Sequence, residues 1–305
     1  MPLMQKAVTP AASAAILEHG YDRVSGFALR AADVSFATGA EALHEAHGLG
    51  YPGSPFRADA PWVDVLRFPA SGQLRFEDAI GGTDEVSRLR TGGPFVDRPP
   101  FTGLGYQPVG GRHVPQFWVM HTRVPAGSEL VRVLADGRST TLARFADVGH
   151  GWRAEDGSAP PSGTALSRFV GLMAQWRGTH LAADALPDGG VALASESEPE
   201  LDGFTRTAAG RWRREVPRAE VAELFELVVT AMWGPLLVRV VDQWTDEDGE
   251  QVARVSSIGH DANVAESLGL EKVDAAAYEA NILMSALHEV TPARLVPDDW
   301  APATA

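Results

Sequence analysis

The segment LLVRVVDQWTDEDGEQVARVSSIG, residues 236–259, decides how the C-terminal half of this chain folds. Apolar and polar side chains alternate in LLVRVVDQW (236–244) and again in QVARVSSIG (251–259). Between them lies TDEDGE, a short acidic segment that contains a glycine. Alternation with a period of two indicates half-buried strands, and a short glycine-containing connection is typical of a hairpin. We therefore expect an antiparallel hairpin here.

Similar patterns recur on the N-terminal side of this hairpin. An alternating strand is expected at 62–68, and a β-meander over 116–147, where ADGRS forms a turn between ELVRVLA and TTLARFA. Further short strands are expected around GVALAS, GRWRREVP and YEANILMSAL. The segment 219–232 begins with helical periodicity and ends in β-branched residues, which leaves helix and strand both open.

Several short helices are expected between these strands. A strand near 34–36 is followed by a helix through 40–47, with Thr38 as the N-cap and Glu41 at the capping-box spacing. Other helices are expected at 77–90, 164–176 and 261–269, and the first residues are expected to form a short helix or a loose arm. The predicted class is α+β, with antiparallel sheets and short helices.

The length of 305 residues predicts two domains, because a single core usually stops growing at about 250–300 residues. The polar, proline-containing segment 153–163 marks the boundary, giving domains 1–157 and 158–305. Residues 34–49 and 255–270 align without gaps, with five identities. A chance match of local patterns is favoured over a true repeat.

Composition excludes several classes of function. Cysteine is absent, which removes disulfides, thiol nucleophiles and common zinc knuckles. The formal net charge of −14 disfavours nucleic acid as a partner and favours a basic protein. Neither a secretory signal nor a membrane span is evident, so a soluble cytoplasmic protein is expected. The two lysines, Lys6 and Lys272, against 24 arginines are typical of a high-GC bacterial genome.

Motifs that carry a mechanism are scarce. The chain has no phosphate-binding loop, dinucleotide fingerprint, zinc helix or nucleophile elbow. The Gly/Pro-rich loop 91–106 contains Arg98, Thr102 and Tyr106, which could bind an anionic group, although a rigid packing loop is favoured. His44 and His47 lie three residues apart, where packing is favoured over a shared metal ion. No metal site is predicted.

One region resembles part of the ADP-ribosyltransferase family. The pattern VSFATGAEALHEAHG (34–48) followed by PWVDVLRFP (61–69) is similar to the strand, helix and strand of that family. PAGSELVRV (125–133) is similar to the strand that carries its NAD-binding arginine, which places that role on Arg132. The order of these strands is inverted and no Glu-x-Glu motif follows. The resemblance implies a NAD-consuming enzyme, with NAD as its cofactor.

A second region resembles uncharacterised domains of high-GC bacteria that accompany polymorphic toxins. It runs from WGPLLVRVVDQ (233–243) to VSSIGHDANVAESLGLEKVDAAAYEANI (255–282). This resemblance implies an immunity-type or toxin-associated protein that binds a partner without catalysis and without a cofactor. The sequence therefore favours a non-catalytic protein-binding function, with the NAD-consuming enzyme as the alternative.

Overall fold

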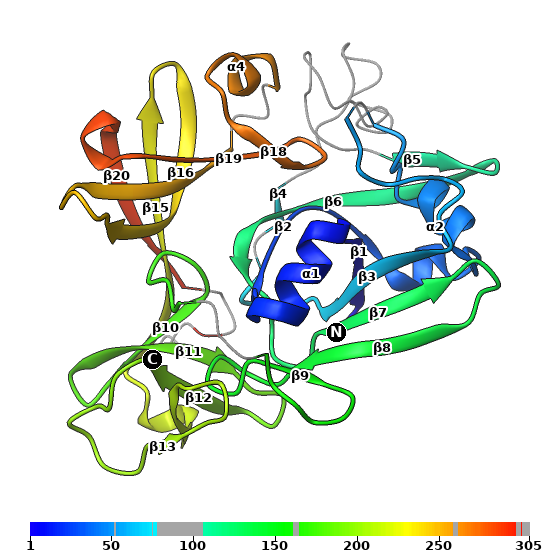
Figure 1. Ribbon diagram of the computed structural model, residues 1–305. Coiled ribbons are helices and arrows are strands. Elements are labelled where there is room, and N and C mark those ends of the chain that lie inside the picture. Colours follow the sequence, from blue (N-terminus) through cyan, green and yellow to red (C-terminus); the bar gives the residue numbers. More distant parts are fainter. Residues whose placement is uncertain are drawn as a thin grey trace.

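The computed structural model describes residues 1–51, 53–74, 76–77, 106–160, 165–258, 262–296 and 300. These residues form two antiparallel sheets and a few short helices (Figure 1), which confirms the predicted α+β class. The helix expected at 77–90 lies outside the described residues, apart from Glu77. Among the described residues, no helix is long and apolar enough to cross a membrane.

The first sheet has nine strands, and its central strand is the N-terminal segment of the chain. The strand order is β4-β6-β2-β1-β3-β7-β8-β9, with β5 paired to β6. The strands are β1 (Leu3–Ala7), β2 (Arg23–Arg30), β3 (Trp62–Pro69), β4 (Phe76–Glu77), β5 (Tyr106–Val109), β6 (Arg112–Arg123), β7 (Glu129–Leu134), β8 (Ser139–Phe145) and β9 (Trp152–Ala154). Of the two alternatives expected for the N-terminal segment, the loose arm is wrong, because β1 is paired on both edges, and the short helix forms at Pro10–His19.

Helices cover both faces of this sheet. Figure 1 shows α1 (Pro10–His19) enclosed by the curving strands, and its Ile16 packs in one core with Phe68 of β3. On the opposite face, Leu43 of α2 (Ala40–Ala46) packs with Val65. The two faces follow from the alternation of β3, because successive side chains of a strand point to opposite sides. Between β2 and α2 lies a short 3-10 helix, η1 (Ala31–Val34).

The second sheet has eleven strands. Their order is β13-β14-β12-β11-β10-β15-β16-β17-β19-β18, with β20 paired to β15. The strands are β10 (Leu172–Trp176), β11 (Thr179–Ala185), β12 (Gly190–Ser195), β13 (Thr205–Arg206), β14 (Trp212–Pro217), β15 (Glu223–Trp233), β16 (Leu236–Thr245), β17 (Gln251–Ser257), β18 (Glu271–Asp274), β19 (Ala277–Leu283) and β20 (His288–Leu295). The helix α4 (Ala262–Ser267) and the 3-10 turns η2 (Arg218–Glu220) and η3 (Met284–Ala286) connect them.

Several local predictions are confirmed and others are wrong. The β16–β17 hairpin, β3, α2 and α4 form where the sequence indicates them. The helix expected at 164–176 is wrong: β10 occupies its end, after Gly171 takes a φ of 78° that a helix does not allow. The ambiguous segment 219–232 contributes η2 and then the strand β15.

Two further corrections concern pairing and capping. The expected meander over 116–147 holds only for the β7–β8 hairpin, because β6 pairs with β2 instead of β7. The expected strand at 34–36 is replaced by the end of η1 and a turn. The N-cap of α2 is Gly39, which offers no side-chain hydrogen bond, so Thr38 does not cap this helix.

The chain completes the first sheet by residue 154 and begins the second at residue 172. The expected boundary at 157/158 falls in this connection, and the division into two domains stays a prediction. The tail also contributes to the second core, where Trp300 is buried beside Trp176 and Leu224.

Candidate functional site

Buried polar side chains join the two sheets. The last three residues of β6 each reach the second sheet in turn. The ring of His121 lies 3.3 Å (Nδ1 to Oε1) from Glu279 of β19, and the Thr122 hydroxyl donates to Glu226 of β15 at 2.8 Å. Arg123 donates to the carbonyl oxygens of Val170 and Ala183. A polar junction of this kind positions the sheets through directional contacts.

One carboxylate in this junction is poorly satisfied. Asp184 of β11 is fully buried, and its nearest cation is Arg123, at 3.7 Å from Nη1 to Oδ1. Neither carboxylate oxygen has a hydrogen-bond partner of good geometry among the described residues. Burial raises the pKa of Asp184 to about 7, and the attraction of Arg123 opposes this only in part. Asp184 therefore titrates near neutral pH.

A cavity of about 600 Å³ is lined by residues of both sheets, including Glu279 of this junction. The start of α1, with Ala12 and Ile16, forms an apolar wall together with Leu66. The β18–β19 hairpin, which reaches across to the first sheet in Figure 1, forms the polar wall. Its charged lining consists of four basic and three acidic side chains: Lys6, Arg23, Arg254, Lys272, Glu271, Asp274 and Glu279.

Both lysines of the chain line this cavity, although they are far apart in the sequence. Lys6 of β1 is buried and forms an ion pair with Asp274 of β18. The hydroxyl of Tyr51 donates to the other oxygen of Asp274 at 3.2 Å. The ammonium of Lys272 lies 5.1 Å from the ring centroid of Tyr51. Residues of both sheets thus meet in one cluster.

The same wall of the cavity contains a second charged cluster. Glu279 accepts a hydrogen bond of 2.6 Å from Nε of Arg254, and His121 approaches its other oxygen. Although burial opposes ionisation, these two partners hold the pKa of Glu279 at about 2. Burial also raises the pKa of Tyr21, which lines the cavity next to Glu279. The carboxylate is therefore charged and the phenol neutral at physiological pH.

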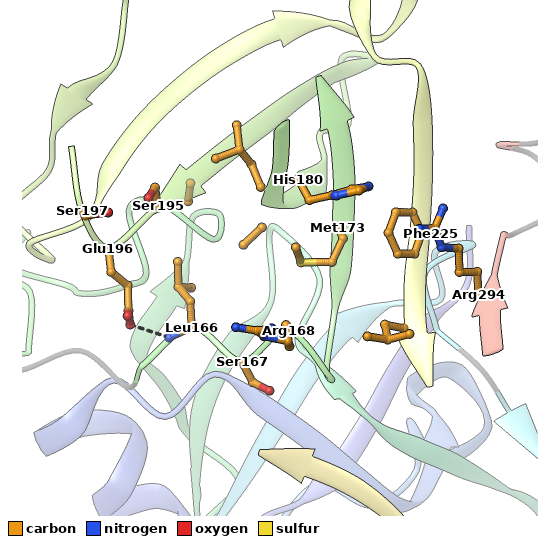
Figure 2. A pocket seen from close by; sticks show the side chains of 14 residues that line it. Leu166, Ser167, Arg168, Met173, His180, Ser195, Glu196, Ser197, Phe225 and Arg294 are labelled. Carbon is orange, nitrogen blue, oxygen red and sulfur yellow. Dashed lines mark hydrogen bonds between the residues drawn. The ribbon is translucent and has the colours of Figure 1, made fainter. Parts of the chain in front are cut away.

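A second hollow of about 570 Å³ lies on one face of the second sheet (Figure 2). Its apolar lining includes Met173, Phe225 and Ala182. These three residues are neighbours across adjacent strands, because Met173 pairs with Phe225 on one side and with Ala182 on the other. Its charged residues, such as Arg168 and Glu196, are exposed. Figure 2 shows the hydrogen bond that the backbone N–H of Leu166 donates to Glu196. All of its lining residues come from the second half of the chain. The inter-sheet cavity, with buried charges from both sheets, is the stronger candidate.

Of the four sequence-predicted site residues, Arg132 is the one whose side chain the structure describes. Arg98 and Thr102 lie outside the described residues, and Tyr106 begins β5 without a described side chain. Arg132 of β7 forms two hydrogen bonds of 2.8 Å with Asp64 and lies over the Trp62 ring. This guanidinium therefore already has an internal carboxylate partner.

His44 and His47 lie in different surroundings. His47 is buried and shares a hydrogen bond of 3.1 Å with Gln5, and burial together with the Lys6 charge lowers its pKa to about 3. His44 is less buried, and burial lowers its pKa as well. Among the described residues, no group of three histidine or acidic side chains is placed to hold a metal ion.

Sequence reasoning missed the residues of the inter-sheet cavity. Lys6 and Lys272 were interpreted as a trace of genome composition, and no local motif surrounds either of them. The sequence contained one signal of these positions, which is the rarity of lysine. The chain uses arginine for 24 of its 26 basic residues, so the two lysines mark positions where an ammonium is present in place of a guanidinium. No family model, no curated protein and no solved structure matches this chain.

Proposed function

We propose that this protein is a non-catalytic binding protein, and that its inter-sheet cavity holds a small organic anion with an apolar body. The observation that carries the proposal is the convergence of both lysines, Lys6 and Lys272, on this one cavity. Arginine supplies nearly every other positive charge in the chain, so the site is chemically distinct from the rest of the molecule.

The chemistry of the walls supports this class of ligand. Basic side chains outnumber acidic ones in the lining, whereas the whole chain carries a net charge of −14. The helix α1 begins at the cavity, and its first turn contains no acidic residue. A helix N-terminus favours negative charge, and the apolar wall favours an aliphatic or aromatic body. Cavities between structural units are common ligand sites.

Binding of 8-anilinonaphthalene-1-sulfonate, an aromatic sulfonate that fluoresces in apolar sites, tests the proposal. We expect saturable binding of one dye per chain. Lys272→Met should weaken it about tenfold or more, since a charge-assisted hydrogen bond contributes about 1.5–3 kcal/mol. Ala11→Glu should also weaken binding, because Ala11 lies in the lining and exposed on the first turn of α1. A carboxylate there does not oppose helix formation.

Matched variants separate this site from other hydrophobic surfaces. Leu17→Glu adds the same charge to the same helix outside the cavity, and Arg168→Met removes a cation from the hollow of Figure 2. Both should leave the dye affinity unchanged. If Lys272→Met and Ala11→Glu bind the dye as the parent protein does, or if Arg168→Met abolishes binding, the proposed site is wrong.

A protein partner of basic character is also part of this proposal, in line with the immunity-type role that the sequence favours. Support comes from the acidic segments 196–202 and 246–250, whose carboxylates are mostly exposed. Association with such a partner should weaken steeply with salt. The NAD-consuming alternative has less support, because the side chain of Arg132 is engaged by Asp64.

A further inference from the structure

Three residues that line the inter-sheet cavity carry N–H or O–H groups without acceptors among the described residues. They are Tyr21, Arg23 and Arg254, and we call them the donor group. Tyr21 follows α1, Arg23 begins β2 of the first sheet, and Arg254 belongs to β17 of the second sheet. The charge of Glu279, which also lines the cavity, acts on both Tyr21 and Arg254. The donor group therefore gathers around one buried carboxylate.

The phenol of Tyr21 is held in place and keeps its proton. Its ring packs against the core of the first sheet, and the indole of Trp152 donates to its backbone carbonyl at 2.8 Å. Burial, together with the negative charge of Glu279, raises the pKa of the hydroxyl well above its usual value. Within the part of the chain that the structure describes, this hydroxyl has no hydrogen-bond acceptor. It is therefore a neutral donor that is available to a ligand.

The guanidinium of Arg254 is oriented at one end and open at the other. Its Nε donates to Glu279 at 2.6 Å, whereas its terminal nitrogens have no acceptor among the residues described. Arg23 shows the reverse arrangement. Its terminal nitrogens donate to the carbonyl of Val241 and to Asp242, and its buried Nε has no partner in the described chain. Both arginines therefore retain unused N–H donors.

The charges of these two arginines are already balanced. Arg254 forms an ion pair with Glu279, and Arg23 forms one with Asp242 at 2.8 Å. A further anion at this point would compete with these carboxylates, and a buried charge without its own partner is costly. A neutral carbonyl oxygen needs only donors. If the carbonyl belongs to an amide, Glu279 offers an acceptor for its N–H, because a carboxylate has about four lone-pair sites.

We propose that the donor group binds an amide carbonyl of the ligand, so that the ligand is a carboxylic acid whose apolar chain is interrupted by an amide. This inference rests on the proposed function, which places the anionic group and the apolar body of the ligand in the same cavity. Tyr21 and Arg254 supply the donors for the carbonyl oxygen. Because they belong to different halves of the chain, the amide contacts both walls of the cavity.

Displacement of the anilinonaphthalene sulfonate by matched acids tests the inference. The probes are the hexanoyl amides of glycine, β-alanine and γ-aminobutyrate, which place the amide at increasing distances from the carboxylate. Straight-chain carboxylates of equal length are their controls. Tyr21→Phe should weaken the tightest of the three amide acids about threefold to tenfold, as expected for one hydrogen bond, and leave its straight-chain control within about twofold. Arg254→Lys, which keeps the charge but loses the terminal nitrogens, should have the same effect.

Tyr51→Phe is the matched control variant. Tyr51 lines the same cavity, but its hydroxyl donates to Asp274, so its loss should change the affinities of both kinds of acid by the same factor. If Tyr21→Phe and Arg254→Lys weaken amide and straight-chain acids equally, or weaken neither, the inference is wrong although the proposed function stands. If no acid displaces the dye from the parent protein, the proposed function fails and the inference fails with it. Urea unfolding shows whether a variant is folded, and where one of the two is destabilised the other decides.

Discussion

Replacing Asp184 by asparagine should change how the stability of this protein depends on pH. The carboxyl group is fully buried, and its pKa is raised from 3.8 to about 7. Between these two values the folded chain keeps the proton while the unfolded chain has released it. The free energy of unfolding contributed by this group therefore falls as pH rises from about 4 to about 7. An asparagine at this position would titrate in neither state.

The size of the effect follows from the pKa difference. One unit corresponds to about 1.4 kcal/mol, so the raised pKa costs at most about 4 kcal/mol above pH 7. Between pH 5 and pH 8, Asp184→Asn should gain about 3 kcal/mol in stability relative to the parent protein. Comparing the two proteins at each pH removes the opposite contribution of His47, whose pKa is lowered and which destabilises the folded state as pH falls below 6.5.

Urea unfolding at a series of pH values from 5 to 8 measures this difference. Asp136→Asn is the matched control, because Asp136 is exposed and Arg138 lowers its pKa, which keeps its titration below the range tested. A stability difference between Asp184→Asn and the parent protein that stays constant over this range, or that shrinks as pH rises, would refute the reasoning.

Two other substitutions probe features of the same junction and of the first sheet. Gly171→Ala should lower stability by about 1–3 kcal/mol, since Gly171 has a φ of 78° and an added Cβ would lie 2.7 Å from Arg123. Gly178→Ala, with a similar φ of 81° and open space around it, isolates the backbone cost, and equal melting temperatures for both variants would contradict the packing argument. Arg132→Met should destabilise the fold by about 1–2 kcal/mol, since it leaves a buried carboxylate unpaired while the arginine itself is partly exposed. It should leave the dye affinity unchanged, and a NAD-dependent thermal shift that disappears in this variant would instead favour the enzyme alternative.

Local patterns predicted the elements whose stability is local. The β16–β17 hairpin, the strand β3 and the helix α4 each have a periodicity or a turn that neighbouring residues determine. The same patterns do not predict the order of the strands within a sheet. β1 lies at the centre of the first sheet because β2 and β3 pair with its two edges, and both pairings join distant segments.

The candidate site was hidden for a related reason. Lys6 and Lys272 belong to different sheets and meet only when the β18–β19 hairpin contacts the first sheet. Positions 6 and 272 are too far apart in the sequence for any local spacing to predict that they line the same cavity. The prediction of a helix at 164–176 was wrong for a local reason, because apolar residues at 169, 170, 172 and 173 also suit a bend followed by a buried strand.

The polar end of β6 has a consequence for how the chain is made. The strands of the first sheet are synthesised before β15 and β19, so His121 and Thr122 are made before the residues that they contact on the second sheet. Water can solvate these groups during that interval, whereas an apolar junction would leave an adhesive surface on the nascent chain. A polar junction of this kind therefore leaves less apolar surface exposed while the second sheet is still being made.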